Sequence, residues 1–192
     1  MEKLLPIVQK LSAFANNPPV YTWVDPCNDV SWLVRPLFIQ NHLRVMHSWL
    51  NNVNSFTNQS FDRGKQQLIK HYRDRLRSET EQSFCIQRKK QMVAQFDLVP
   101  AEGSPLALMH PIDEDGFALY YIFPGDHSHE YCPCSLELFM RLVFSSYPDH
   151  SLFLEVPVGQ RAIYKVATNM GFNQVNEYWH QQREVGLFRA KL

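Results

Sequence analysis

Apolar residues in the second half of the chain repeat with a helical period. The stripe from Leu136 to Phe144 follows the spacing i, i+3, i+4, i+7 and i+8, which predicts a helix with one buried face. A second stripe from Ile163 to Met170 predicts another helix, which Gly171 ends in the left-handed conformation that glycine readily adopts. Similar spacing predicts two earlier helices, over residues 43–53 and 68–76.

Short apolar runs bounded by charged or turn-forming residues predict the strands. They span Ser83–Gln87, Gln91–Val99, Ala107–His110, Phe117–Phe123, Leu152–Val156, Gln174–Trp179 and Glu184–Arg189. The first four strands follow one another through short turns, and the fifth lies between the two later helices. This order predicts a single α/β domain. The proline-containing residues 1–34 are expected to be an N-terminal extension packed on a domain formed by residues 35–192.

The segment Pro124–Ser135 is predicted to be a loop that leads from a strand into a helix. Such a loop suits anion binding, because the unpaired N–H groups and the dipole of the helix both point at the ligand. Within it, the stretch His127–Cys134 contains five residues of metal-ligating type, which are His127, His129, Glu130, Cys132 and Cys134. Zinc sites usually draw their ligands from more widely separated segments, so a metal-responsive role is the weaker alternative for this loop.

Composition and charge exclude several classes of protein. The chain has 192 residues, of which 45% are hydrophobic and 20% charged, as in a globular protein. Nineteen basic and nineteen acidic residues balance, so no overall field favours nucleic acid or an anionic membrane. No run approaches the roughly 20 apolar residues of a membrane span. The cysteines do not form a disulfide framework, which predicts reduced thiols and a cytoplasmic protein.

Three stretches of the sequence, in a fixed order, carry a resemblance to a known family. They are Arg35-Pro36 with His47-Ser48-Trp49-Leu50-Asn51, Met109-His110-Pro111 with Asp115-Gly116, and Leu142-Val143-Phe144 through Leu152–Glu155 to Asn169–Phe172. From Arg35 to its end, the chain resembles the GNAT acyl-CoA-dependent N-acyltransferases. More narrowly, it is similar to enzymes of hydroxamate siderophore biosynthesis, the aerobactin-type hydroxylysine acetyltransferase and the mycobactin lysine acyltransferase. The resemblance implies a GNAT-like domain with a mixed, mostly antiparallel sheet flanked by helices.

The resemblance also implies roles for individual residues. His110 would act as general base on the acceptor nitrogen, because an imidazole titrates near working pH. Tyr164 would protonate the leaving thiolate. Backbone groups of Ile122 and Phe123 would polarise the thioester carbonyl. The remaining candidates are His129, Cys132, Cys134, Ser135 and Gln160 for the CoA moiety, and His47 and Trp49 for the acceptor pocket.

Two function hypotheses follow from these residues. In the first, the chain transfers an acyl group from acetyl-CoA or a longer acyl-CoA to a hydroxylamine-bearing small amine such as hydroxylysine, hydroxyornithine or a hydroxylated diamine. Siderophore-assembly enzymes or a second copy of the chain would then be its partners. In the second, the chain has lost CoA binding and acts as a binding or regulatory partner. The second rests on His129–Pro133, which replaces the glycine-rich phosphate loop of the family and has a proline without an N–H.

Overall fold

Nine strands form one mixed sheet in the computed structural model, which describes residues 20–25, 29–52, 56–58, 64–112, 115–125, 128–180 and 183–191. The strands are β1 (Tyr21–Asp25), β2 (Val30–Pro36), β3 (Phe56–Thr57), β4 (Gln82–Arg88), β5 (Gln91–Pro100), β6 (Phe117–Phe123), β7 (Ser151–Pro157), β8 (Asn173–His180) and β9 (Arg183–Lys191). Their order is β1-β2-β4-β5-β6-β7-β9-β8, and β3 pairs with β6 outside this path. Among these pairs, β6 and β7 run parallel and the others antiparallel, which confirms the predicted kind of sheet.

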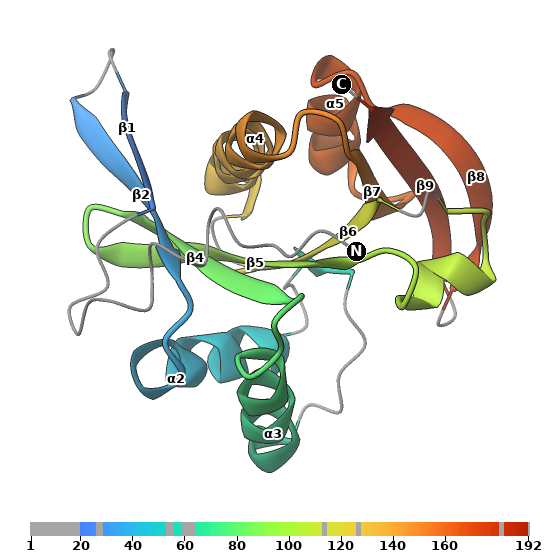
Figure 1. Ribbon diagram of the computed structural model, residues 1–192. Coiled ribbons are helices and arrows are strands. Elements are labelled where there is room, and N and C mark those ends of the chain that lie inside the picture. The colour runs from blue at the N-terminus through green and yellow to red at the C-terminus, as the bar shows by residue number, and fades with distance from the viewer. Residues whose placement is uncertain are drawn as a thin grey trace.

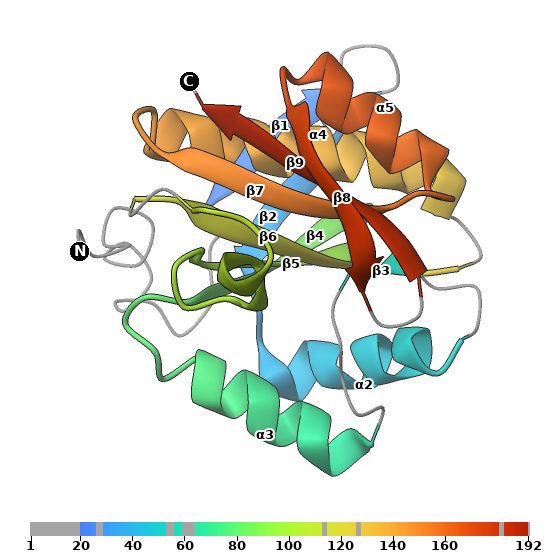
Figure 2. The same ribbon diagram turned by 90° about the vertical axis from the view of Figure 1, so that its right-hand side faces the viewer.

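Helices cover both faces of the sheet. Figures 1 and 2 show α2 (Ile39–Leu50) and α3 (Lys65–Arg75) on one face, with α4 (Ser128–Ser146) and α5 (Arg161–Asn169) on the other. Each of the four predicted helices is therefore confirmed. Gly171 follows α5 with φ of +86°, the left-handed conformation expected of it. None of the described helices is long and apolar enough to cross a membrane.

The strand β6 lies at the centre and is buried along its whole length. Phe117, Leu119, Tyr121 and Phe123 alternate toward the core beneath α4 and α5, whereas Ile122 joins the core beneath α2 and α3. A strand covered on both faces needs apolar residues at every position, which explains the unbroken run of seven in the sequence. The two layers of helices thus position this strand from both sides.

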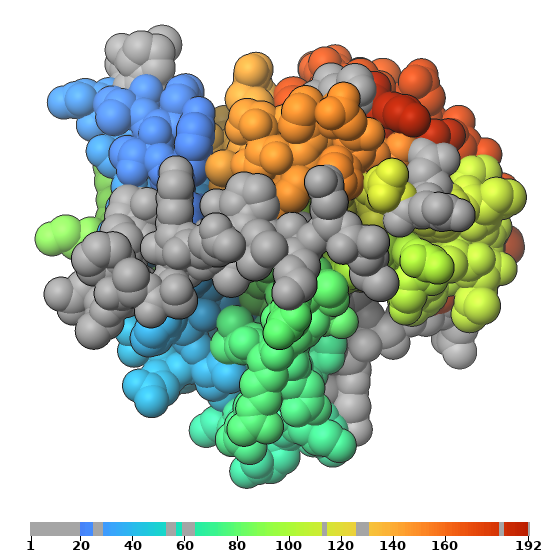
Figure 3. Space-filling view, in the orientation of Figure 1, coloured from blue at the N-terminus to red at the C-terminus, as the bar shows by residue number. Residues whose placement is uncertain are grey.

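The described part of the N-terminal segment extends the sheet. β1 pairs with β2, and β2 pairs with β4 over Trp32–Pro36. In the space-filling view of Figure 3, β1 and β2 stand beside α4 on one face of the molecule. Residues 1–19 of the expected extension lie outside the described residues.

The strand predicted at Ala107–His110 is wrong. These residues belong to a 3-10 turn, η1 (Pro105–Leu108), and the segment that follows it. Pro105 opens the turn, where its fixed φ suits a helical start and its missing N–H is not needed. Leu106 packs against the sheet with Val99, whereas Ala107, Leu108 and Met109 are all exposed, so the alternation expected of a strand is absent.

A buried polar cluster ties α3 to β5. The fully buried carboxylate of Asp97 accepts hydrogen bonds from the Tyr72 hydroxyl at 3.2 Å and from Gln95 Nε2 at 2.5 Å. Arg75 Nη1 lies 2.5 Å from Asp97 Oδ2, and Arg75 Nε donates to Glu81 at 2.8 Å. A carboxylate buried this deeply needs a cation, so the pair fixes where α3 lies on the sheet.

We expect Arg75→Met to lower the free energy of unfolding by about 3–5 kcal/mol, because the charge of Asp97 would remain buried without its cation. Urea denaturation followed by circular dichroism measures the loss. The double variant Arg75→Met/Asp97→Leu should recover most of it, whereas Lys70→Met on the exposed side of α3 should change little. A double variant as unstable as the single one would contradict this explanation.

Candidate active site at the opening between β6 and β7

The two parallel strands at the centre of the sheet part before they end. β6 and β7 pair over Phe117–Leu119 and Leu152–Leu154. Beyond this point β6 pairs with β3 through Ile122 and Phe123, while β7 continues beside β9. The sheet therefore opens at the carboxyl ends of its parallel strands, which is where α/β folds commonly bind ligands.

Asn58 fills the start of this opening with its side chain, which is 2% exposed. Its Nδ2 donates to the carbonyl oxygens of Leu119 at 3.0 Å and Glu155 at 3.3 Å, and its Oδ1 accepts the N–H of Tyr121 at 2.8 Å. One amide thus satisfies backbone groups of both strands where they separate. The adjacent carbonyl of Thr57 accepts a hydrogen bond from Arg183 at 2.8 Å, which ties β3 to the start of β9.

A phenol and an amide line the opening on the side of α4 and α5. Tyr121 is fully buried, and its hydroxyl donates to Gln160 Oε1 at 2.8 Å. Gln160 is the N-cap residue of α5. Burial raises the pKa of the Tyr121 phenol well above its usual range, so this group stays protonated and acts as a hydrogen-bond donor.

A carboxylate and an imidazole lie on the other side of the same strands. Glu155 in β7 is 2% exposed, and its carboxylate accepts a hydrogen bond from the Tyr178 hydroxyl. His180 Nδ1 lies 3.0 Å and 3.3 Å from the two oxygens of this carboxylate. Burial raises the pKa of the Tyr178 phenol, and the hydrogen bond to Glu155 and its charge raise it further. A neutral phenol and an imidazole therefore hold one buried carboxylate.

His110 and Tyr164, the predicted catalytic residues, lie apart from these contacts. His110 follows η1 and is half-buried, and the neighbouring carbonyl of Met109 accepts a hydrogen bond from Asn176 of β8 at 3.1 Å. Tyr164 is 44% exposed on α5, where its ring packs edge-on against Phe188. The roles of both residues remain predictions.

The predicted cofactor residues at the strand end are brought to the opening. Ile122 and Phe123 pair with Thr57 and Phe56 of β3, so another strand lies along the edge that was expected to face the thioester. Gln160 reaches the opening through its hydrogen bond to Tyr121. The structure thus gathers these three residues around β6.

The loop predicted at His127–Cys134 is wrong for its greater part, because α4 begins at Ser128. Pro133 lies inside the helix beyond its first turn, where it removes one intrahelical hydrogen bond, and the helix continues through it. Cys132 and Ser135 are buried, and Cys134 is exposed. Burial raises the pKa of the Cys132 thiol, which keeps it protonated. His127 and the side chain of His129 lie outside what the structure describes.

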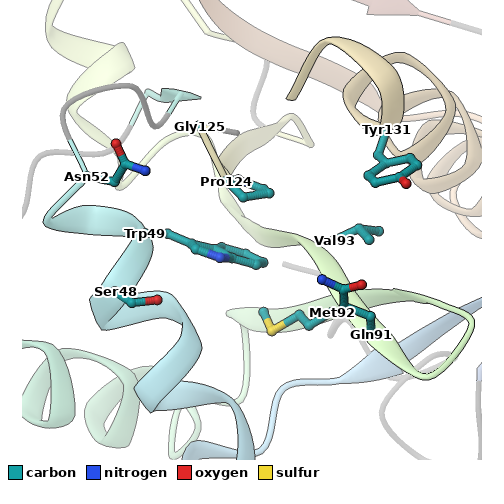
Figure 4. Close-up of a pocket in the computed structure, with 9 residues that line it drawn as sticks. All are labelled: Ser48, Trp49, Asn52, Gln91, Met92, Val93, Pro124, Gly125 and Tyr131. Carbon is teal, nitrogen blue, oxygen red and sulfur yellow. The ribbon is translucent and has the colours of Figure 1, made fainter. Parts of the chain in front are cut away.

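A cavity of about 410 Å³ lies next to Pro124 and Gly125, the two residues that follow β6. It is lined by Ser48, Trp49, Asn52, Gln91, Met92, Val93, Pro124, Gly125 and Tyr131. Figure 4 shows the Trp49 ring pointing from α2 toward the start of β5. Trp49 thus lines a pocket, as its predicted role in the acceptor site requires. His47 lies one residue before Ser48 and is half-buried, and its Nε2 lies 3.3 Å from Asn51 Nδ2.

Sequence reasoning missed Asn58, Glu155 as a functional group, and His180. Glu155 carried a usable signal, because a lone carboxylate inside the apolar run Leu152–Val156 must find a polar partner when it is buried. His180 and Asn58 carried none, since each stands in a polar stretch where histidine and asparagine are ordinary. Across the described residues, no three His, Cys, Asp or Glu side chains come together as metal ligands.

Comparisons with known proteins bear on the fold. No family model matches the sequence, and no curated protein matches it. A crystal structure of an uncharacterized protein from Bacillus halodurans superposes with a TM-score of 0.71 at 12% identity, covering 89% of each chain. Spermidine N-acetyltransferase from Vibrio cholerae, in complex with CoA and spermine, superposes with a TM-score of 0.63 at 14% identity, covering 83% of this chain and 94% of that one. The likeness confirms the predicted GNAT-like fold.

Proposed function

We propose that this chain is an acyl-CoA-dependent N-acyltransferase that acts on a small amine. The observation that carries the proposal is the opening between β6 and β7, which has an acid–base pair at its edge. The similar spermidine N-acetyltransferase, with the same fold, was crystallised with CoA and spermine. The pantetheine arm of CoA is an extended chain with two amide groups, so it can pair with a strand edge as an added strand does.

The acceptor that we propose is a hydroxylamine-bearing amine such as hydroxylysine, hydroxyornithine or a hydroxylated diamine. The resemblance of residues 35–192 to siderophore acyltransferases supports this choice, and the product would be a hydroxamate. The nitrogen attacks the thioester carbon, the carbon–sulfur bond breaks, and CoA leaves as the thiol. Backbone groups near Ile122 and Phe123 would polarise the carbonyl, because N–H groups aimed at the developing oxyanion stabilise it.

The segment 56–58 must move for this reaction to take place. β3 pairs with Ile122 and Phe123, and Asn58 holds the N–H of Tyr121. The pantetheine arm would take over these groups, so the segment and the cofactor compete for one strand edge. The N–H groups of the first turn of α4, which begins at Ser128, would then face the pyrophosphate.

A second candidate function is a diverged GNAT-like protein that serves as a binding or regulatory partner without CoA. The filled opening favours it, because Asn58 already satisfies the backbone groups that a cofactor would use. The first turns of α4 also favour it, since Pro133 replaces the small residues that let a backbone approach a phosphate. CoA binding separates the two candidates.

We expect acetyl-CoA or a longer acyl-CoA to bind the chain and raise its melting temperature, because a ligand that binds only the folded state stabilises it. At 100 times the dissociation constant the gain is about 2.7 kcal/mol. Calorimetric titration and thermal shift measure both effects, with free pantetheine as the control that lacks the nucleotide. Absence of binding at millimolar acyl-CoA, in the wild type and in Asn58→Ala alike, would reject the enzyme and support the second candidate.

We expect Asn58→Ala to lower the free energy of unfolding by at least about 2 kcal/mol, because it leaves buried backbone groups of β6 and β7 unpaired. The same variant should bind acyl-CoA several-fold more tightly than the wild type, since the competitor for the strand edge is gone. Urea denaturation and calorimetry measure the two effects. Asn169→Ala, at the exposed end of α5, is the matched control and should change neither. Lower stability with unchanged affinity would show that Asn58 and the cofactor occupy different places.

A further inference from the structure

We propose that His180 is the general base of the acylation and that Glu155 is the residue that positions it. The inference rests on the proposed function and names the group that takes the proton from the acceptor nitrogen. His180 lies at the end of β8, and Glu155 lies in β7 at the point where the central strands part. The sequence indicates His110 for the same role, so the experiment below is designed to decide between the two histidines.

The pair stands at the edge of the opening. The backbone carbonyl of Glu155 accepts the hydrogen bond from Asn58 Nδ2 at 3.3 Å, so this residue forms the edge itself. Its carboxylate lies on the face of the sheet away from α4 and α5, where Phe153 of the same strand packs with Leu106 of η1. A group held by this carboxylate can meet a substrate only from that face or through the opening.

Hydrogen bonding fixes which nitrogen of His180 is basic. An ionised carboxylate only accepts hydrogen bonds, so the contact of 3.0 Å assigns the hydrogen of the neutral ring to Nδ1. The lone pair then resides on Nε2, the nitrogen that accepts a proton when a carboxylate orients an imidazole in this way. The Tyr178 hydroxyl donates to the same carboxylate and holds it from a second side. No comparable hydrogen bond or ion pair to the ring of His110 is found in the part of the chain that the structure describes.

The reaction balances without a further reactant. The acceptor nitrogen forms a bond to the thioester carbon as the carbon–sulfur bond breaks. The proton lost by the nitrogen passes to His180 Nε2, and the imidazolium then gives a proton to the thiolate of CoA. Glu155 keeps its negative charge throughout and stabilises the imidazolium while it exists.

The groups packed around the pair support this arrangement. Tyr178 of β8 lies beside the imidazole, with 6.4 Å between the two ring centroids. The phenols of Tyr178 and of Tyr120 in β6 stay neutral, because burial raises the pKa of both. Arg183 of β9 pairs with His180 in the hairpin register, and its guanidinium donates to the carbonyl of Thr57.

The experiment compares thiol release from acetyl-CoA, with a hydroxylamine-bearing amine as acceptor, among variants of the full chain. His180→Gln should lower kcat at least about 100-fold, the usual contribution of a general base, with the KM for acetyl-CoA within twofold of the wild type. Glu155→Gln should lower kcat less than His180→Gln does, again with the KM for acetyl-CoA within twofold of the wild type, because it leaves the base in place and weakens only its orientation. Glu137→Gln, on the exposed side of α4, and His150→Gln, at the start of β7, are the matched controls and should leave both unchanged.

The outcomes separate this inference from the proposed function. Full turnover in His180→Gln, with activity lost in His110→Gln, would overturn the inference and leave the acyltransferase intact. A wild-type chain that neither binds nor turns over acyl-CoA would overturn both. Nitrogen NMR of the His180 ring provides a readout that needs no cofactor: a neutral ring with its hydrogen on Nδ1 supports the assignment, and one with its hydrogen on Nε2 contradicts it. Thermal unfolding and acyl-CoA affinity of each variant show whether lost activity reflects lost structure.

Discussion

Two parallel strands that part leave backbone groups without partners, and the centre of this molecule is arranged around that constraint. Where β6 and β7 separate, the carbonyls of Leu119 and Glu155 and the N–H of Tyr121 are buried and must be paired. Asn58 pairs all three, because its amide has donors and an acceptor on one short, planar group. A hydrocarbon side chain would fill the space and leave these groups unsatisfied. Any ligand that replaces Asn58 must therefore bring hydrogen-bond donors and an acceptor of its own, as the amides of a pantetheine arm would.

The groups around the opening come from distant parts of the sequence because each strand delivers its residues at the same end of the sheet. The crossover from β6 through α4 to β7 makes these two strands parallel, so Tyr121 and Glu155 both lie near their carboxyl ends. The hairpin of β8 and β9 then returns beside β7 and brings His180 and Arg183 to this place. Packing of α4 and α5 on one face, and of α2, α3 and η1 on the other, fixes the strands that carry them.

Most of the fold could be predicted from the sequence, because it depends on periodic burial. The stripe from Leu136 to Phe144 and the apolar run of β6 each have one favourable arrangement. The start of α4 was missed, because a proline in a polar stretch indicates a break, whereas α4 continues through Pro133 with one intrahelical hydrogen bond fewer. The segment Ala107–His110 was misjudged because four residues with three apolar side chains fit a short strand and a 3-10 turn equally well.

The candidate site was harder to predict than the fold, because its contacts join positions whose separation in the sequence gives no hint of their proximity. Asn58 lies 97 residues from Glu155, and His180 lies 25 residues beyond it. The family resemblance implies His110 as the general base, whereas the pairing of β7, β8 and β9 brings His180 next to Glu155. The resemblance indicates the fold through residues of the core. Core residues do not determine which polar side chain lies at the edge of the opening.

The opening joins the two faces of the sheet, which carry different polar groups. Successive residues of a strand point to opposite faces, so Tyr121 lies with α4 and α5 while Tyr120 lies with Phe153 on the other side. The phenol of Tyr121 and the pair of Glu155 and His180 are thus separated by the sheet except where β6 and β7 part. In the proposed reaction the cofactor would enter from the side of α4 and its acyl carbon would reach the opening, while the acceptor would arrive from the side of His180. In that reaction the segment 56–58, which satisfies the backbone groups where the strands part, would also keep the two substrate sides apart until the cofactor replaced it.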